Sequence, residues 1–392
     1  MKAGGRNTKL GDLIDIQNGY AFSSKDYSES GHFLMRIGNV QSGQITLTDP
    51  KFVQLPASGS LQRFVLAEGD LLVSLTGYVG RVAEVCEEHL PAALNQRVAK
   101  VTLKPQSQVN KKYLLHFLGS DLFLNPLVAA GHGAAQQNVS TKDIVAIEMP
   151  IPSPEAQHRI VAILDEAFDG IATAKANAEK NLQNTRALFE SHLQSVFTEQ
   201  GEGWVTKSLN SLAEFSQGIQ VGLGDQVKEP SEGFVRFIRI IDYTQGTDEI
   251  RYVKNPVRKY WADKTDIVMV RYGTPGLIGR GIEGVIANNL FKISILDKQL
   301  TNDFLAYFLS QRSVQGYLRN QGALAMPAIT FKQLGGVEVT YPTETTKQNS
   351  IVSLLDSIND EIQRLESLYQ QKLTTLDDLK KSLLHQAFSG AL

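Results

Sequence analysis

The sequence predicts a mixed α/β protein with an internal pseudo-two-fold repeat, in which two similar globular domains are separated by two long helices forming an antiparallel coiled coil. The first observation is a run of matches between the middle of the chain and its end, all shifted by 191 residues: Gln157, Leu164, Leu182 and Phe197 recur as Gln348, Leu355, Leu373 and Phe388. The second is an apolar spacing of four and three in both copies, typical of helices that pair. The third is a set of short apolar runs closed by glycine, repeated in both remaining segments.

Residues 1–152 are predicted to form the first globular domain. Residues 71–75 form a short apolar run typical of a buried strand, and residues 96–103 alternate as a half-buried strand does. Residues 111–127 have helical patterning, and residues 146–151 resemble a strand again. This mixture predicts an α/β domain.

Residues 153–203 are predicted to form a long spacer helix. Ser153 can cap its start and Pro154 suits the first turn. The helix-pairing positions in this copy include Ile160, Leu164, Ile171 and Leu182.

Residues 204–342 repeat the first domain with shifting offsets. Gly19 matches Gly218 at an offset of 199, and Asn95 is paired with Asn288 at an offset of 193. Insertions and deletions therefore fall within the globular domains, where loops are expected.

Residues 343–392 are predicted to form a C-terminal helix that pairs with the first. Its helix-pairing positions include Ile351, Leu355, Ile358, Ile362 and Leu365. Small residues in the first copy, such as Ala167, stand where the second has large ones, as expected for helices packed together. About 45 residues at ~1.5 Å each would make a rod of about 65 to 70 Å. Two independent surface helices are the alternative, and the antiparallel register is left open.

Composition indicates a cytoplasmic protein with no membrane partner. The chain has 392 residues, 42% hydrophobic and 20% charged, without an N-terminal signal pattern or an apolar run of 18 residues. Cys86 is its one cysteine and is expected to be a buried, inert thiol.

The net charge of -2 conceals an uneven distribution. Basic and acidic residues number 14 and 13 in residues 1–152, 4 and 8 in 153–203, 16 and 13 in 204–342, and 5 and 7 in 343–392. The globular segments are thus the more basic ones, which permits contact with phosphates without requiring it.

Catalytic and metal-binding patterns are missing from the sequence. Gly279, Gly281 and Gly284 match G-x-G-x-x-G, but the following residues resemble a strand, so a tight turn is expected instead of a nucleotide site. The seven histidines have no metal-ligand spacing, so no metal site is expected.

Each globular segment instead carries planar, bidentate polar side chains beside glycines. Arginine can pair with guanine, and asparagine or glutamine with adenine, in the major groove of DNA. The candidate DNA-binding residues are Tyr20, Arg36, Asn39, Tyr78, Arg81, Asn95, Arg97, Gln136, Gln137, Asn138 and Lys142 in the first domain, and Gln217, Gln220, Arg239, Tyr243, Arg271, Tyr272, Arg280, Asn288 and Lys332 in the second.

The pattern as a whole resembles the DNA-specificity subunit of Type I restriction-modification systems. The segments that carry the resemblance are LGDL at residues 10–13, GDLLVS at 69–74, ALNQR at 93–97, GAAQQNVS at 133–140, IPSPEAQHRIV at 151–161 and SLLHQAFSG at 382–390. The second half departs from the pattern at residues 323–327 and 341–348.

This resemblance implies two target-recognition domains that read an asymmetric bipartite sequence in double-stranded DNA. It implies as partners two methylation subunits bound along the helices and, through them, motor-nuclease subunits. Methyl donor and ATP are expected in those partners, so this chain would be a non-catalytic subunit without cofactors. The alternatives are a coiled-coil adaptor that binds only protein, and a fused methyltransferase or nuclease, which the missing motifs disfavour.

Overall fold

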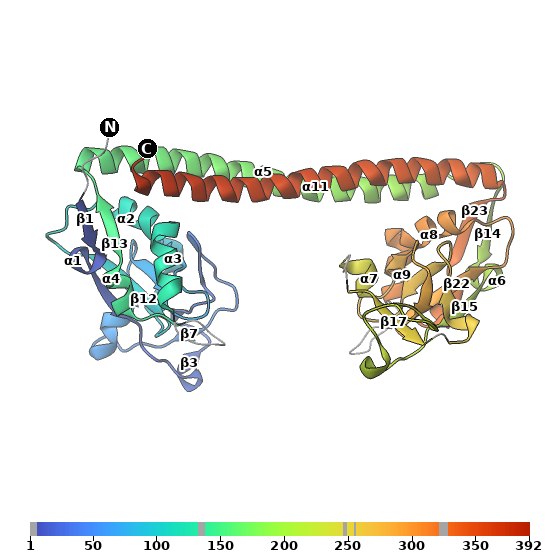
Figure 1. Cartoon of the computed structure of the whole chain (residues 1–392), viewed down its shortest axis with the longest axis horizontal. Coiled ribbons are helices and arrows are strands. Elements are labelled where there is room, and N and C mark those ends of the chain that lie inside the picture. The colour runs from blue at the N-terminus through green and yellow to red at the C-terminus, as the bar shows by residue number, and fades with distance from the viewer. Residues whose placement is uncertain (1–5, 132–137, 246–248, 255, 321–327) are drawn as a thin grey trace. The chain divides into compact units, whose positions relative to one another are not determined.

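The computed structural model describes residues 6–131, 138–245, 249–254, 256–320 and 328–392. The chain divides into two compact units, the first comprising Met1–Glu179 and Gln371–Leu392 and the second Lys180–Gln370. Each unit therefore contains one globular domain together with parts of both long helices (Figure 1). This division cuts through the helices, whereas the sequence-based one assigned each helix to a segment of its own.

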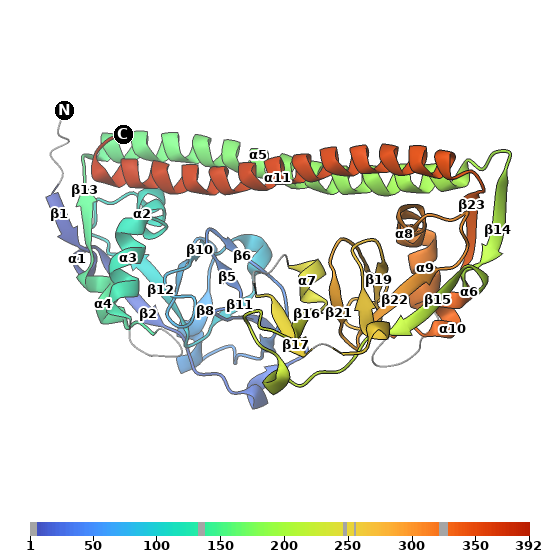
Figure 2. The ribbon, with the colours of Figure 1, turned by 45° about the vertical axis from the view of Figure 1, so that its right-hand side comes forward.

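The two long helices are α5 (Pro154–Thr198) and α11 (Thr345–Ser389), each of 45 residues. In the first unit Lys175 Nζ lies 2.8 Å from Asp377 Oδ1, and in the second Arg186 Nε lies 2.6 Å from Glu366 Oε1. Leu164 clusters with Phe388 in the first unit, and Phe197 clusters with Leu355 in the second. Within each unit, therefore, residues later in α5 contact residues earlier in α11, and the pairing is antiparallel (Figures 1 and 2).

A buried seam runs along both helices. The predicted pairing residues Ile160, Leu164, Ile171, Leu355 and Ile362 are at most 7% exposed. Leu182, Ile351, Ile358 and Leu365 are half-buried, and Ile351 packs against the core of the second unit. In α5, Leu164, Ile171, Ala178 and Thr185 follow one another at intervals of seven and are all buried, which is the spacing of a coiled-coil contact.

The first unit contains thirteen strands and four short α-helices among its described residues. The strands are β1 (Arg6–Lys9), β2 (Ile14–Asn18), β3 (Tyr27–Ser28), β4 (His32–Met35), β5 (Val40–Gln41), β6 (Gln44–Ile45), β7 (Phe52–Val53), β8 (Val65–Leu66), β9 (Leu71–Ser74), β10 (Val82–Glu84), β11 (Ala92–Leu94), β12 (Val98–Leu103) and β13 (Glu148–Ile151). The helices are α1 (Leu10–Leu13), α2 (Lys111–Leu118), α3 (Asp121–Ala130) and α4 (Thr141–Ala146).

The second unit repeats this order with fewer strands. The strands are β14 (Trp204–Ser208), β15 (Ala213–Gln217), β16 (Phe234–Ile238), β17 (Arg251–Lys254), β18 (Trp261–Ala262), β19 (Ile267–Val270), β20 (Ile278–Gly279), β21 (Gly284–Ile286), β22 (Leu290–Ile295) and β23 (Glu338–Pro342). The helices are α6 (Leu209–Leu212), α7 (Ile241–Thr244), α8 (Asn302–Ser310), α9 (Arg312–Asn320) and α10 (Phe331–Gly335).

Two main sheets form each unit. The first unit has the strand orders β10-β9-β12-β2 and β3-β7-β4-β11-β8, and the second has β15-β22-β19-β20 and β17-β16-β21-β18. In each unit one pair of strands in the second sheet is parallel, β4 with β11 and β16 with β21, and the other strand pairs are antiparallel. The prediction of two similar mixed α/β domains is confirmed.

Aromatic side chains anchor each long helix in the core of a unit. In the first unit Phe388 of α11 packs against Tyr113 and Phe117 of α2, with ring centroids 5.0 and 5.3 Å apart. In the second, Phe197 of α5 packs against Phe304 and Phe308 of α8, with centroids 5.2 and 5.4 Å apart. The last turn of each helix is therefore part of a core.

Two sequence-based expectations need correction. The helix predicted over residues 111–127 is broken at Gly119 and Ser120, because Ser120 is an extended residue that begins α3. Cys86 is exposed, because the buried strand β10 ends two residues before it and the chain turns at the surface there. Partial desolvation nonetheless raises the pKa of the Cys86 thiol, and the nearby carboxylates of Glu84, Glu88 and Glu68 raise it further.

No single helix in the described part of the chain is long and apolar enough to cross a membrane. Helices α2 and α3 reach the length and apolar composition of a membrane span only when taken together, and the axis bends by 53° between them. Tyr113, Phe117, Phe123 and Leu127 of this pair are buried in the core of the first unit, which explains its apolar composition.

Candidate nucleic-acid interface

Both units share a place where two backbone segments cross in close contact. A Cβ atom added to Gly19 would lie 2.2 Å from the carbonyl oxygen of Asn95, and one added to Gly218 would lie 2.2 Å from that of Ala287. Real Cβ atoms do not approach so closely, so glycine is required at both positions. The same close crossing is therefore built into the backbone of both units.

A turn follows this contact, and we call it the crossing turn: residues 95–98 in the first unit and 287–290 in the second. Its first and last residues are joined by a hydrogen bond in both cases, Val98 N–H to Asn95 C=O and Leu290 N–H to Ala287 C=O, each 2.9 Å long. Asn95 thus corresponds to Ala287. The sequence-based pairing of Asn95 with Asn288 was wrong by one residue, because it matched identical residue types, whereas an alanine occupies the backbone position of Asn95 in the second unit.

A second repeated feature is an arginine that holds a neighbouring loop. The backbone N–H of Arg36 donates to Asn39 Oδ1 at 3.1 Å, and that of Arg239 donates to Asp242 Oδ2 at 2.7 Å. Each guanidinium also donates to a backbone carbonyl further along the chain, that of Asp49 or Glu249. Both predicted arginines therefore stabilise the loops beside the crossing turn.

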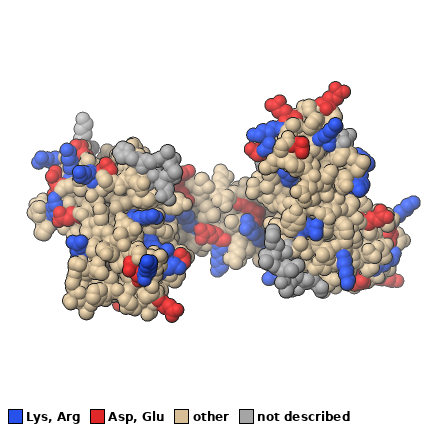
Figure 3. All heavy atoms as spheres, turned by 90° about the horizontal axis from the view of Figure 1, so that it is seen from below, with Lys and Arg blue, Asp and Glu red and all other residues tan. Residues whose placement is uncertain are grey.

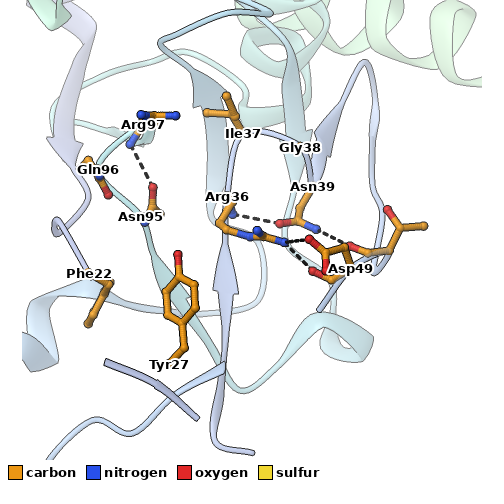
Figure 4. A pocket seen from close by; sticks show the side chains of 11 residues that line it. Phe22, Tyr27, Arg36, Ile37, Gly38, Asn39, Asp49, Asn95, Gln96 and Arg97 are labelled. Carbon is orange, nitrogen blue, oxygen red and sulfur yellow. Dashed lines mark hydrogen bonds and ion pairs between the residues drawn. The ribbon is translucent and has the colours of Figure 1, made fainter. Parts of the chain in front are cut away.

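In the first unit these features surround a hollow of about 420 Å³. Arg36 and Asp49 form an ion pair at 3.0 Å on one side, and Arg97 lies on the other (Figure 4). Hydrogen bonds from Lys51 and Arg36 lower the pKa of the Asp49 carboxyl, so it stays ionised. The aromatic side chains of Phe22 and Tyr27 also line the hollow, and the sequence analysis did not select them.

Three predicted residues are committed to interactions inside the protein. The Asn39 side chain is 2% exposed and its amide donates to the carbonyls of Thr46 and Thr48. Burial raises the pKa of Tyr243, whose ring lies against Gly279. Arg280 forms an ion pair with Asp303. These three side chains therefore stabilise the fold through contacts within the protein.

Another exposed feature of the first unit is the loop between β9 and β10. Gly77 and Gly80 have φ of +71° and +78°, which places Tyr78 on a tight, left-handed bend. The Arg81 guanidinium lies 3.8 Å from the centroid of the Tyr78 ring and donates to Gln41 Oε1 at 2.7 Å. Tyr78 is 63% exposed, so this stack is presented to solvent.

In the second unit, four predicted residues meet around the crossing turn. The Tyr272 hydroxyl donates to Asn288 Oδ1, and Asn288 Nδ2 donates to Gln220 Oε1, both at 3.3 Å. Gln217 Nε2 donates to the Asn288 carbonyl at 2.8 Å. Residues separated by 71 positions in sequence therefore form one group of amide side chains.

The remaining predicted residues have varied positions. Tyr20 is 41% exposed and packs edge-on against Phe22, with centroids 4.9 Å apart. The Arg271 guanidinium lies 5.6 Å from the centroid of the Phe291 ring. Lys142 and Lys332 are exposed on α4 and α10, and Asn138 forms a bridge with Thr76. Gln136 and Gln137 lie outside the described residues.

Surface charge on the described residues follows the modest excess seen in the sequence. Figure 3 shows Lys and Arg side chains dispersed over the displayed face of each unit, not gathered into one patch. In the described ranges no group of three or more His, Cys, Asp or Glu residues could hold a metal ion.

These observations define a class of protein: a duplicated α/β module in which the same backbone crossing carries different polar side chains in each copy. The model of the Type I restriction modification DNA specificity domain matches residues 6–183 and again residues 201–374. The chain therefore belongs to the family of Type I restriction-modification DNA specificity subunits. It is a non-catalytic DNA-recognition subunit.

Known proteins similar to this chain agree with that assignment. The StySPI specificity subunit of Salmonella potsdam and the EcoKI specificity subunit of Escherichia coli K12 are each 22% identical, over 92% of this chain and 82% of their own length. A structure described as the basis of complex assembly and conformational transition of the type I R-M system covers 99% of this chain and 98% of its own, with 20% identity and a TM-score of 0.77. The HsdS subunit of Thermoanaerobacter tengcongensis covers 99% and 97%, with 19% identity and a TM-score of 0.55.

Proposed function

We propose that each unit reads one half of an asymmetric bipartite target in double-stranded DNA. The observation that carries this proposal is the crossing turn, which has the same backbone hydrogen bond in both units but different side chains: Gln96 and Arg97 are exposed in the first unit, and Asn288 and Asn289 are half-buried in the second. One backbone with two sets of base-reading groups predicts two different half-sites separated by an unread gap.

We further propose that two methylation subunits bind along the long helices and bring motor-nuclease subunits to the DNA. Support comes from large aliphatic side chains exposed at repeat-related positions: Ile163 and Leu354 are 38% and 53% exposed, and Leu188 and Leu379 are 53% and 45% exposed. The first unit carries Ile163 on α5 and Leu379 on α11. The second unit carries Leu188 on α5 and Leu354 on α11. Equivalent apolar positions in both units fit two copies of one partner.

In this proposal methyl donor and ATP are bound by the partner subunits, and the assembly acts on cellular DNA in the cytoplasm. No residue of this chain is assigned to either molecule. The chain selects the DNA sequence, and it does so with its own side chains and without a bound cofactor.

The test is exchange of residues 1–152 for the first domain of another specificity subunit, followed by mapping of methylated sites in cells that also express the methylation subunits. One half-site should change and the other should stay the same. A change in both half-sites would contradict the proposal that each unit reads one of them. If the unaltered chain binds its protein partners but shows no sequence-selective binding of DNA, it is a protein-binding adaptor instead.

A further inference from the structure

The crossing turn presents different chemistry at equivalent backbone positions. Leu75 N–H donates to the carbonyl of Arg97 at 3.0 Å, and Arg271 N–H donates to that of Asn289 at 2.8 Å. Arg97 therefore corresponds to Asn289, and the preceding Gln96 corresponds to Asn288. Because the backbone is the same, a difference in what the two turns bind must come from these side chains.

In the first unit Arg97 carries an uncompensated positive charge. Its side chain is exposed, and no ion pair or hydrogen bond engages its guanidinium within the ranges that the structure describes. Arg36, the other arginine at the hollow, is paired with Asp49. The open hollow of about 420 Å³ lies beside Arg97 (Figure 4), so a planar group can approach the guanidinium without displacing protein atoms.

The second unit has asparagines at both of these positions: Asn289 stands at the position of Arg97, and Asn288 stands at that of Gln96. Asn288 lies between Tyr272 and Gln220, with contacts of 3.3 Å on both sides, near the long limit of hydrogen bonds. An amide offers one donor and one acceptor side by side, whereas a guanidinium offers donors alone. The guanidinium of the first turn can therefore bind a base edge that carries two acceptors. The amide of the second turn can bind an edge that carries an acceptor next to a donor.

We propose that the crossing turn determines one base in each half-site: Arg97 reads a guanine in the half contacted by the first unit, and Asn288 with Gln220 reads an adenine in the other half. Guanine presents the acceptors O6 and N7 in the major groove, and adenine presents N7 with the N6 amino donor. This inference rests on the proposed function, since it identifies which bases the two units select.

The alternative role for Arg97 is contact with a phosphate. A phosphate contact would strengthen binding to every sequence, and lysine would largely replace arginine because a single point charge suffices. Guanine reading requires two parallel N–H donors, which lysine cannot supply in a fixed fork. Substitution to lysine and to alanine therefore separates the two roles.

The experiment selects bound duplexes from a randomised DNA library, using the full chain assembled with the methylation subunits of its own system. The unaltered complex should enrich a two-part motif that contains a guanine in the half read by the first unit. Arg97→Ala should reduce the preference for this guanine over the other bases by about 10- to 100-fold. Arg97→Lys should lose the same preference while keeping the salt dependence of binding. The other half-site should remain unchanged in both variants.

A triple substitution provides the positive control. Ala21 corresponds to Gln220, because the bridges Tyr20 to Asn95 and Ile219 to Ala287 are equivalent. Ala21→Gln with Gln96→Asn and Arg97→Asn therefore copies the second turn and its glutamine, and should move the preference at that position towards adenine. An unchanged motif, or a uniform loss of affinity that lysine restores, would overturn the assignment of Arg97. If the unaltered complex enriches no motif, the proposed function itself fails, and that outcome is distinct from the others.

Discussion

The side chain of Gln157 accepts a hydrogen bond from the backbone N–H of Asn110 at 2.8 Å, which joins the first turn of α5 to the residue that caps α2. Gln157 Nε2 also donates to the carbonyls of Pro152 and Gln108. Gln348 makes the same set of contacts in the second unit, to the N–H of Thr301 and to the carbonyls of Pro342 and Gln299. A buried glutamine thus attaches each long helix to its domain.

Replacing Gln157 with leucine should destabilise the first unit. The substitution leaves a buried N–H and two carbonyls without their partner, and we expect the free energy of unfolding to fall by about 2 to 4 kcal/mol. Urea unfolding combined with amide hydrogen exchange would measure this loss and locate it. Gln348→Leu should act equally on the second unit, whereas Gln183→Leu, at an exposed position of α5, should change stability by less than about 0.5 kcal/mol.

His116 should make the first unit less stable in mild acid. Burial lowers the pKa of His116 and outweighs the 2.8 Å contact with Asp165, while Lys112 and Lys380 lower it further. The unfolded chain takes up a proton near pH 6.5 that the folded unit resists, so stability falls as the pH drops below about 6.5 towards the folded pKa.

The second unit supplies the control for this effect. Tyr307 occupies the position of His116 there and donates to Asp356 Oδ1 at 2.5 Å. His116→Tyr should therefore keep the contact with Asp165 and reduce the difference in melting temperature between pH 7.5 and pH 5.5. An unaltered difference would show that His116 is not the group responsible.

Removing the Arg81 side chain should weaken specific DNA binding while leaving folding intact. The guanidinium stacks on the exposed Tyr78 ring, so Arg81→Ala removes a preorganised cation and should cost about 1 to 3 kcal/mol with the cognate duplex. A fluorescence titration would measure the affinity. Arg364→Ala, at a site 73% exposed on α11, is the matched control; equal affinities for the Arg81 variant and the unaltered chain would remove Arg81 from the reading surface.

The exposed aliphatic residues of the long helices should each support one copy of the partner. Ile163→Glu with Leu379→Glu, both in the first unit, places charges on that apolar surface and should release one methylation subunit of two. The pair Leu188→Glu and Leu354→Glu should release the other. Native mass spectrometry would count the copies, and retention of both by each double variant would exclude these surfaces.

The sequence was sufficient for the duplication and the helix seam because both rest on local periodicity. Buried Leu164 and Leu355 follow directly from the apolar spacing. It was insufficient for the site, since exposure and partners of polar side chains depend on contacts distant in sequence. Asn39 and Arg97 are both polar residues of turns between strands, yet the Asn39 side chain is buried and hydrogen-bonded, whereas the Arg97 side chain is exposed and without a partner among the described residues.

Lengthening the coiled coil should lengthen the unread gap in the DNA target. Insertion of four residues near residues 177–181 adds ~6 Å of helix and about 40° beyond a full turn, so the seam is roughly retained. At ~3.4 Å per base pair, the reading domain would move by almost two base pairs. The recognised half-sites should stay the same while the preferred gap grows by one or two base pairs, part of which bending of the DNA can absorb.

The antiparallel register makes a sharper version of this experiment possible. Lys175 pairs with Asp377 and Arg186 with Glu366, so an insertion after residue 179 of α5 is matched by one near residue 373 of α11. The paired insertion retains every seam contact on both sides, and it should produce a larger and cleaner shift than either single insertion. Methylation of targets that differ only in gap length is the measurement. A paired variant that still prefers the original gap would show that the helices do not set the spacing.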